Sequence, residues 1–479
     1  MRGVINTRVE ITGFGRGARG CEGGVMSAVG SDLRRVVRGR VLLPGDEGFE
    51  LAGTPWNLAV RQQVSAVVEV ADAADAAALV RYAAAAEGPL STRATGHSPS
   101  AAADGTVLVT TRALDGIEVD AAARVARVQA GVSWQPVLER AAAHGLAGAC
   151  GSSAVVGVTG YTLGGGVGWF ARSRGYAAHA VRALEVVTAD GDQRRVTADS
   201  DSDLFWALRG GGGDFALVTG LEFELFEAPE LFGGRILWPA ERTEAVIAAF
   251  QQATAEAEEG LSLWLTLIQF PPFPQVPEFL RGQAMVAIDV VALGAVTAPL
   301  RLFDEIPGAV LDTRRPLNAA QVGDVAMEPT DPSPARVRGE LLTAFSPRVS
   351  DALLAAAAPQ GSVGPLALVQ IRHLGGALTR PPADAGCAGA IDEPYLLSLL
   401  APAPTPEIEA VVVERRDAVA DALRPHCSGR KPFTYLDSGE TPAAAFDAAA
   451  LARLQDIKAR RDPDGLFRSN FPVAPAVTV

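Results

Sequence analysis

The chain has 479 residues, of which 48% are hydrophobic and 20% charged, and its formal net charge is −13. This length exceeds one ordinary core, so we expect a globular protein of two or three lobes. The acidic balance argues against nucleic acid or an anionic membrane as a partner. The sequence contains no run of about 18 apolar residues, so we expect no membrane-spanning helix.

Two further features bear on the compartment of the protein. Its cysteines are Cys21, Cys150, Cys387 and Cys427, and this wide spacing fits neither a zinc site nor a dense disulfide framework. We therefore expect reduced thiols, no metal and a cytoplasmic protein. The N-terminus lacks the apolar segment of a signal peptide. We predict a disordered extension over residues 1–35, and we favour Met26 over Met1 as the native start, although the sequence does not decide between them.

Strands and helices alternate over residues 36–227, which predicts an α+β domain with a mixed sheet. Asp72 is the expected N-cap of the first helix, and Asp190-Gly191 turns a hairpin. The predicted elements, in chain order, are a strand and helix (64–86), a strand (105–111), a hairpin (116–131), a helix (133–146), a hairpin (181–198), and a helix, glycine loop and strand (202–226).

After residue 228 the pattern changes. The segments LSLWLTLIQF, GQAMVAIDVVAL and GPLALVQIRHLGG predict strands, and RTEAVIAAFQQATAEAEEG predicts a helix. We therefore expect a second domain over residues 228–431, with an antiparallel sheet backed by helices. In the C-terminal segment 432–479, PFTYLD predicts a short strand and AAAFDAAALARLQDIKARRDPDGLF predicts a helix that ends at Asp462-Pro463.

Glycine clusters carry the strongest functional signal. GSSAVVGVTGYTLGGGVGW spans residues 151–169 and RGGGGDF spans 209–215. Glycine lets a ligand approach the backbone amides closely, so two such loops in one domain predict a cofactor cradle rather than ordinary turns. GVGWFA at 166–171 matches a relaxed dinucleotide fingerprint, but no buried strand precedes it and Gly175 ends any helix soon after it, which argues against a nicotinamide site.

Five motifs together resemble one family. RATGHS, GVTGYTLGGGVGW, VVTADG, DLFWALRGGGGDFALVT and RRDPDGLFRSN occur in the order and spacing of the berberine bridge enzyme-like FAD-linked oxidases, of the vanillyl-alcohol oxidase or p-cresol methylhydroxylase-type (PCMH) superfamily. The resemblance covers residues 40–473. It implies a two-subdomain FAD-binding domain, a substrate domain over the isoalloxazine ring, and a C-terminal segment that returns to the FAD domain.

The resemblance also implies the cofactor and its contacts. In many members the histidine at the position of His97 is bonded to the flavin, and the alternative is a structural or capping histidine. The implied FAD-binding residues are Arg93, Ala94, Thr95, Gly96, His97, Ser98, Gly151, Ser152, Ser153, Val158, Thr159, Gly160, Tyr161, Gly164, Gly165, Gly168, Gly213, Asp214, Phe215, Val218 and Asn470.

Three positions depart from or refine the family pattern. Thr95 replaces a usual glycine, and its Cβ restricts φ. Ser153 stands where members with a second flavin link carry a cysteine, so we predict a single covalent link through His97. Val158 occupies the position that tends to control oxygen access in the family, and a small valine there favours an oxidase over a dehydrogenase.

Tyr435 is the first choice for the catalytic base. It matches a tyrosine of the family's Tyr-x-Asn-aromatic stretch, although Asp437 and Ser438 replace the following residues. A phenol must have its pKa lowered to act as a base near neutrality. Arg372 and His373 lie on a predicted strand, and we consider a pocket-facing and a solvated placement for them as equals.

The expected reaction is hydride transfer from an alcohol or a secondary-metabolite substrate to FAD, with O₂ as acceptor and H₂O₂ as product. The alternatives are a flavin dehydrogenase, a flavin-oxygenating tailoring enzyme of natural-product biosynthesis, and a degenerate flavin-binding protein. We expect a monomer or homodimer. The sequence does not identify the substrate.

Overall fold

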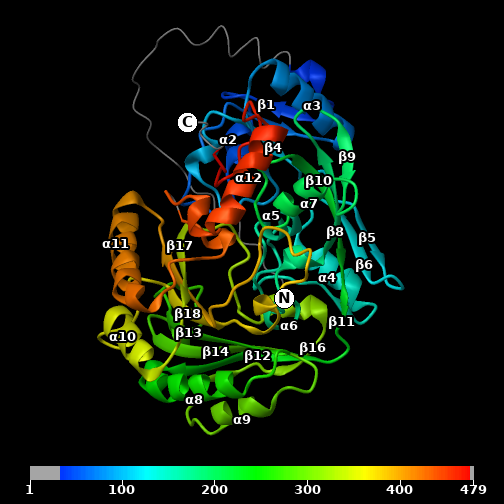
Figure 1. Cartoon of the computed structure of the whole chain (residues 1–479). Helices are drawn as coiled ribbons and strands as arrows, with labels where there is room; N and C mark the ends of the chain where they lie inside the picture. Colours follow the sequence, from blue (N-terminus) through cyan, green and yellow to red (C-terminus); the bar gives the residue numbers. More distant parts are fainter. Residues whose placement is uncertain (1–32, 438, 475–479) are drawn as a thin grey trace.

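The computed structural model describes residues 33–437 and 439–474 (Figure 1). Residues 1–32 of the predicted extension, and with them Met26, lie outside the described residues. Residues 33–36 are helical, and Leu33 is fully buried against the first helix-covered sheet. The end of the predicted extension, residues 33–35, is therefore helical rather than disordered, because Leu33 and Val37 belong to a hydrophobic core.

The first sheet has the order β1-β2-β4-β3. Its β1/β2 pair is antiparallel, and its β2/β4 and β4/β3 pairs are parallel. Asp72 caps α3 as predicted, because its side chain accepts the Asp75 amide at 2.9 Å. The elements here are β1 (Arg40–Leu42), α2 (Phe49–Gly53), β2 (Ala66–Glu69), α3 (Ala73–Ala85), β3 (Leu90–Arg93) and β4 (Val107–Thr110).

The second sheet has the order β5-β6-β10-β8-β9 and is wholly antiparallel. The expectation of one mixed sheet is thus corrected to two larger sheets and a small β7/β11 pair, because the hairpins pair with each other and only the βαβ segment pairs in parallel. The elements are β5 (Ile117–Asp120), β6 (Val125–Gln129), α4 (Trp134–Ala142), β7 (Leu146–Ala147), α5 (Val158–Leu163), α6 (Ala171–Arg174), β8 (Val181–Val187), β9 (Gln193–Val196), α7 (Ser202–Leu208), β10 (Leu217–Glu224) and β11 (Phe226–Glu227).

The third sheet is the predicted antiparallel one, with the order β15-β12-β14-β13-β18-β19-β17 and β16 beside β12. Helices pack on one face of this sheet around a hydrophobic core, at the lower left of Figure 1. The elements are β12 (Leu231–Pro239), α8 (Thr243–Glu256), β13 (Leu261–Gln269), β14 (Ala284–Leu293), α9 (Arg301–Asp304), β15 (Leu311–Asp312), β16 (Arg315–Leu317), β17 (Ala335–Leu342), α10 (Pro347–Ala357), β18 (Leu368–His373), β19 (Tyr395–Pro402) and α11 (Pro406–Leu423).

The C-terminal segment returns to the first two sheets (Figure 1). Leu454 and Ile457 of α12 (Ala448–Arg461) are buried in the core of the second sheet, and Phe467 forms a β-bridge with Leu90. The predicted strand in PFTYLD is wrong: Phe433–Tyr435 is a 3₁₀ turn. Pro432 begins this stretch and has no amide to donate to a ladder, whereas the Tyr435 amide bonds to the Pro432 carbonyl at 2.8 Å.

The fold is therefore α+β, as predicted. Among the described residues, none of the helices combines the length and apolarity that a bilayer crossing demands. The domain boundaries at residues 227 and 431 stay a prediction.

Candidate flavin site and active-site face

Two segments form what we call the cofactor loops: residues 94–98, which follow β3, and residues 151–168, which contain α5. Thr95 connects them. Its Oγ1 lies 3.0 Å from His97 Nδ1 and accepts the Gly157 amide at 3.4 Å. The departure from glycine at position 95 thus supplies a hydroxyl that ties one loop to the other. Gly96 keeps the positive φ of +86° that favours glycine, with Pro55 and Arg93 packed against it.

His97 is half-buried and stacks on Trp56, with ring centroids 4.3 Å apart. Burial lowers the pKa of His97 to about 4, so the imidazole is neutral at physiological pH. Its Nε2 is buried and has no hydrogen-bond partner among the described residues. A neutral, partly unpaired imidazole has the chemistry that a bond to an electrophilic flavin carbon requires.

Unpaired polar atoms also gather on the second cofactor loop. Thr159 Oγ1 and Tyr161 Oη are buried without a partner in the described chain. Gly151 and Gly168 flank the Tyr161 ring so closely that an added Cβ would lie 3.2 Å from Cε2 and 2.6 Å from Oη, respectively. Gly160 is exposed and has open space around it. Buried polar atoms normally find partners, so these loops fit a polar ligand such as FAD.

The remaining predicted residues of the second loop lie close by. Val158 is fully buried, and its amide donates to the Val132 carbonyl at 2.9 Å. Ser153 is buried, whereas Ser152 is half-buried. A Cβ on Gly164 or Gly165 would meet Thr434 or Tyr176, so both glycines permit close packing rather than face open space. On the first loop, Ala94 is half-buried and Ser98 is exposed.

Several other predicted contacts are engaged within the protein. Arg93 donates to the Gly53 carbonyl at 2.8 Å and to that of Ala52. The Asp214 carboxylate accepts the amides of Ser469 and Val473, and so holds the C-terminal segment in place. Phe215 and Val218 are buried in the core of the second sheet, whereas Gly213 has open space around it. A cofactor contact by these residues stays a prediction.

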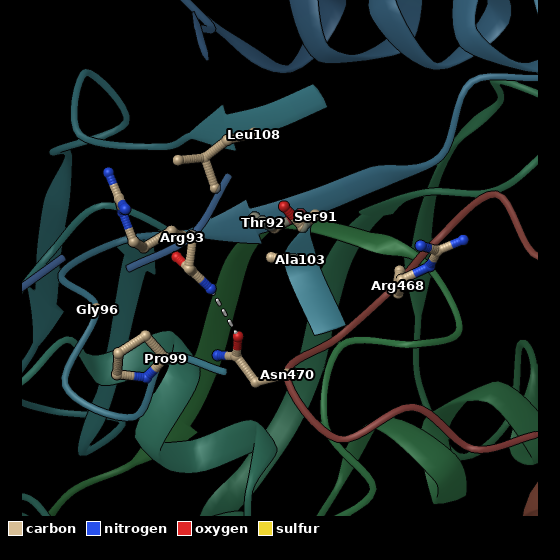
Figure 2. A pocket seen from close by; sticks show the side chains of 10 residues that line it. Ser91, Thr92, Arg93, Gly96, Pro99, Ala103, Leu108, Arg468 and Asn470 are labelled. Atoms are coloured by element: carbon tan, nitrogen blue, oxygen red, sulfur yellow. Dashed lines mark hydrogen bonds between the residues drawn. The ribbon is translucent and has the colours of Figure 1, made fainter. Parts of the chain in front are cut away.

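Asn470 lies at a small pocket together with Arg93, Gly96 and Pro99 (Figure 2). Its Oδ1 accepts from Gln62 Nε2 and from the Ser100 amide, both at 3.2 Å. Asn470 therefore fixes the end of the His97 loop. Gln62 belongs to the site although no sequence motif marks it.

The third sheet contributes a row of buried side chains on the face opposite α8, which we call the polar sheet face. Arg235 Nε and Nη2 donate to Asp289 at 2.5 and 2.9 Å, and Thr266 Oγ1 lies 3.3 Å from the same carboxylate. Gln370 Nε2 donates to Thr266 at 3.0 Å, and Arg372 Nε donates to Gln370 Oε1 at 2.6 Å. The row crosses β12, β14, β13 and β18.

Tyr435 lies against this face, because a Cβ on Gly339 of β17 would run into its ring. The Arg372 guanidinium carbon lies 3.9 Å from the centre of the Trp264 ring and 5.8 Å from that of Tyr435. Burial raises the pKa of Tyr435, and the positive charge of Arg372 opposes this rise. Tyr161 lies near enough for Tyr435 and Arg372 to affect its pKa, which burial raises well above its usual value.

Arg372 and His373 are both buried, so the solvated alternative is excluded for both. They are neighbours on one strand and hence point to opposite faces of the sheet. His373 Nε2 lies 2.9 Å from Arg172 Nη1, and its ring stacks on Tyr395. Burial and the charge of Arg172 lower the pKa of His373 to about 3. The structure thus places Arg372 beside Tyr435 and His373 elsewhere.

The residues that depart from the family pattern after Tyr435 are held by ion pairs. Asp437 pairs with the buried Arg416 of α11 at 2.6 Å, and Glu440 pairs with the buried Lys431 at the same distance. The Asp437 amide donates to Glu440 at 2.8 Å. Asp437 therefore has a structural role: it forms an ion pair with Arg416, which an uncharged asparagine at this position could not form. Ser438 lies outside the described residues.

Comparison with known proteins is consistent with this geometry. The family "FAD binding domain" matches residues 64–197. The chain is 35% identical over 205 residues to (R)-6-hydroxynicotine oxidase of Paenarthrobacter nicotinovorans, which covers 42% of this chain and 45% of the relative. That alignment thus spans about half of the relative's length. Other curated relatives are named glucooligosaccharide oxidase and FAD-dependent monooxygenase.

Two further matches span nearly the whole chain. "Uncharacterized FAD-linked oxidoreductase YvdP" of Bacillus subtilis (strain 168) is 25% identical over 454 residues, which is 91% of this chain and 98% of that protein. The solved structure of berberine bridge enzyme from Eschscholzia californica has a TM-score of 0.78 at 16% identity and covers 94% of this chain and 100% of its own. The chain therefore contains an FAD-binding domain, is similar over nearly its whole length to an FAD-linked oxidoreductase, and has the fold of berberine bridge enzyme.

Proposed function

We propose that the protein removes a hydride from an alcohol or a secondary-metabolite substrate and passes the electrons to O₂, with H₂O₂ as product. One observation carries this proposal: the unpaired polar atoms of His97, Thr159 and Tyr161 line the cofactor loops, in a fold whose relatives are named oxidases. When bound, the flavin supplies the hydride acceptor and the reaction with O₂.

His97 is the proposed single covalent attachment point. The neutral imidazole keeps a lone pair for bond formation, and Trp56 and Thr95 hold the ring in place. We propose no second covalent link to the flavin, because Ser153 occupies the position at which family members with two links carry a cysteine. The nearby Cys150 is buried, and burial raises the pKa of its thiol to about 12. A protonated thiol is a poor nucleophile.

Tyr435 and Arg372 are the proposed substrate-side groups. Tyr435 keeps its proton at neutral pH, because burial raises the pKa of its phenol. Removal of that proton requires stabilisation of the phenolate, and Arg372 is the positive charge beside the ring. His373, in contrast, is held by Arg172 on the opposite face, so we assign it no contact with substrate.

A second candidate function is flavin-dependent oxygenation, which the relatives named FAD-dependent monooxygenases favour. We propose a cytoplasmic protein that acts as a monomer or homodimer. A panel of alcohols, sugars and phenols in an oxygen electrode separates the candidates. An oxidase releases one H₂O₂ per O₂ consumed, whereas an oxygenase incorporates oxygen into the product and releases less.

Acid precipitation tests the attachment. We expect yellow colour to remain with the wild-type pellet and to leave the pellet of His97→Ala. Thr95→Ser is the matched control, because it keeps the hydroxyl that contacts His97 Nδ1. Flavin that washes free of the wild-type protein would refute the covalent link, and a coloured His97→Ala pellet would place the link at another residue.

A further inference from the structure

The polar sheet face has a defined direction of hydrogen-bond donation. The Asp289 carboxylate only accepts, so Thr266 must donate its hydroxyl proton to it. The Thr266 oxygen then accepts from the Gln370 amide nitrogen, which turns the Gln370 carbonyl oxygen toward Arg372. Arg372 Nε donates to that oxygen. The buried carboxylate thus sets the orientation of Arg372 through two intervening side chains.

The charges in this row do not cancel. Asp289 is fully buried and is neutralised by a bidentate pair with Arg235. Arg372 is 9% exposed and forms no ion pair with the described residues. Glu328 influences the pKa values of Arg235 and Tyr435 but makes no ion pair with Arg372. Because Arg372 has no counter-ion, the row retains one uncompensated positive charge. A buried guanidinium without a counter-ion is energetically unfavourable, so this charge favours an anionic ligand.

The contacts of Arg372 within the protein leave the two Nη groups of its guanidinium free to donate hydrogen bonds to a ligand. Nε is engaged by Gln370, and the guanidinium stacks on Trp264, which fixes its plane. Neither Nη atom makes a hydrogen bond within the described chain, and neither is completely buried, so each keeps some accessible surface for a ligand. Two parallel N–H donors in a fixed plane match a carboxylate in particular.

We propose that Arg372 binds a carboxylate group of the substrate, so that the enzyme acts on anionic rather than neutral alcohols. This inference rests on the proposed function, because it places the substrate beside Tyr435 on the polar sheet face. Gln370 is a positioning residue in this scheme: it aims the Arg372 fork, and it does so because Thr266 and Asp289 hold its amide. Asp289 and Arg235 are further positioning residues.

Isothermal titration of the purified protein with benzoate and with its neutral isostere benzamide tests the proposal. We expect the wild-type protein to bind benzoate at least about tenfold more tightly, as one charge-assisted pair allows. Arg372→Gln should remove this preference. Gln370→Glu should also remove it, because the new carboxylate neutralises Arg372 while the guanidinium remains. Arg372→Lys should retain part of the preference.

Arg380→Gln is the matched control, because Arg380 is exposed, pairs with Glu259 and lies outside the site. It should leave the benzoate preference unchanged. Equal binding of the two probes by the wild type, or a preference that survives in Arg372→Gln, would overturn the proposal. The titration does not need turnover, and flavin content is read separately from absorbance. A protein that prefers benzoate but carries no flavin would refute the proposed function and not the anion site.

Discussion

The cofactor loops and the polar sheet face form two sides of the site by opposite means. The cofactor loops consist of small residues and leave polar atoms unpaired, as at His97 Nε2 and Tyr161 Oη. The polar sheet face consists of long polar side chains that bond to one another from Arg235 to Arg372. The two sides thus differ in whether their polar groups are hydrogen-bonded before a ligand binds.

This difference separates binding capacity from preorganisation. Unpaired atoms in the loops are satisfied only when a ligand arrives, so the loops bear a cost until then. On the polar sheet face, the side chains satisfy one another's hydrogen bonds, apart from the Nη groups of Arg372. We therefore expect this face to be rigid before any ligand binds. Mutations should therefore affect chiefly stability on the sheet face and chiefly flavin retention on the loops.

The largest effect is expected at Asp289. Asp289→Ala leaves Arg235 buried without its partner, which should lower the free energy of unfolding by about 3–5 kcal/mol in urea denaturation. The double variant Arg235→Met with Asp289→Leu should recover most of this loss, because no charge is then buried. Full stability in Asp289→Ala would contradict the view that this pair supports the sheet face.

Two glycines of the cofactor site offer a matched comparison. Gly168→Ala should lower the free energy of unfolding by about 1–3 kcal/mol, because its Cβ would clash with the Cys150 carbonyl. Gly213→Ala has open space and should change stability by less than about 0.5 kcal/mol. If flavin packs against Gly213, this second variant should still lose flavin absorbance. Equal flavin content in Gly213→Ala and wild type would remove Gly213 from the cofactor site.

Acid should weaken the fold through its buried histidines. Burial lowers the pKa of His97 and of His179 to about 4, and the pKa of His373 is about 3. The unfolded chain, with histidine pKa values near 6.5, binds protons first as the pH falls. Stability should therefore be constant above about pH 6.5 and decline below it. Urea midpoints between pH 7 and 5 measure this decline, and His179→Gln should make it shallower.

The smallest effect on stability is expected from Tyr161→Phe. Its hydroxyl has no partner among the described residues, so its loss should change the free energy of unfolding by less than about 0.5 kcal/mol. Flavin absorbance or turnover should nevertheless change, because the loops keep this atom for a ligand. A large loss of stability with unchanged flavin would reverse the contrast between the two sides of the site.

Much of the cofactor side follows from the sequence alone. Positive φ, close backbone approach and helix caps are local properties, so the glycine clusters, His97 and the Asp72 cap could be recognised from short segments. The α+β class and the antiparallel sheet likewise follow from periodicity. The 3₁₀ turn at Phe433–Tyr435 was missed because the local pattern of PFTYLD does not reveal that the Tyr435 amide bonds back to Pro432 instead of pairing with a neighbouring strand.

Only the tertiary structure decides the arrangement of the polar sheet face, which we propose as the substrate side. The strand register brings four side chains into one row with Arg372, namely those of Arg235, Asp289, Thr266 and Gln370. Arg235 and Arg372 are 137 residues apart in the sequence, and no local pattern encodes that register. The same register separates Arg372 from its neighbour His373. Likewise, Gln62 reaches Asn470 across 408 residues. The sequence by itself determined which backbone could cradle a cofactor, and the packing of distant strands determined that Arg372, rather than its neighbour His373, lies beside Tyr435.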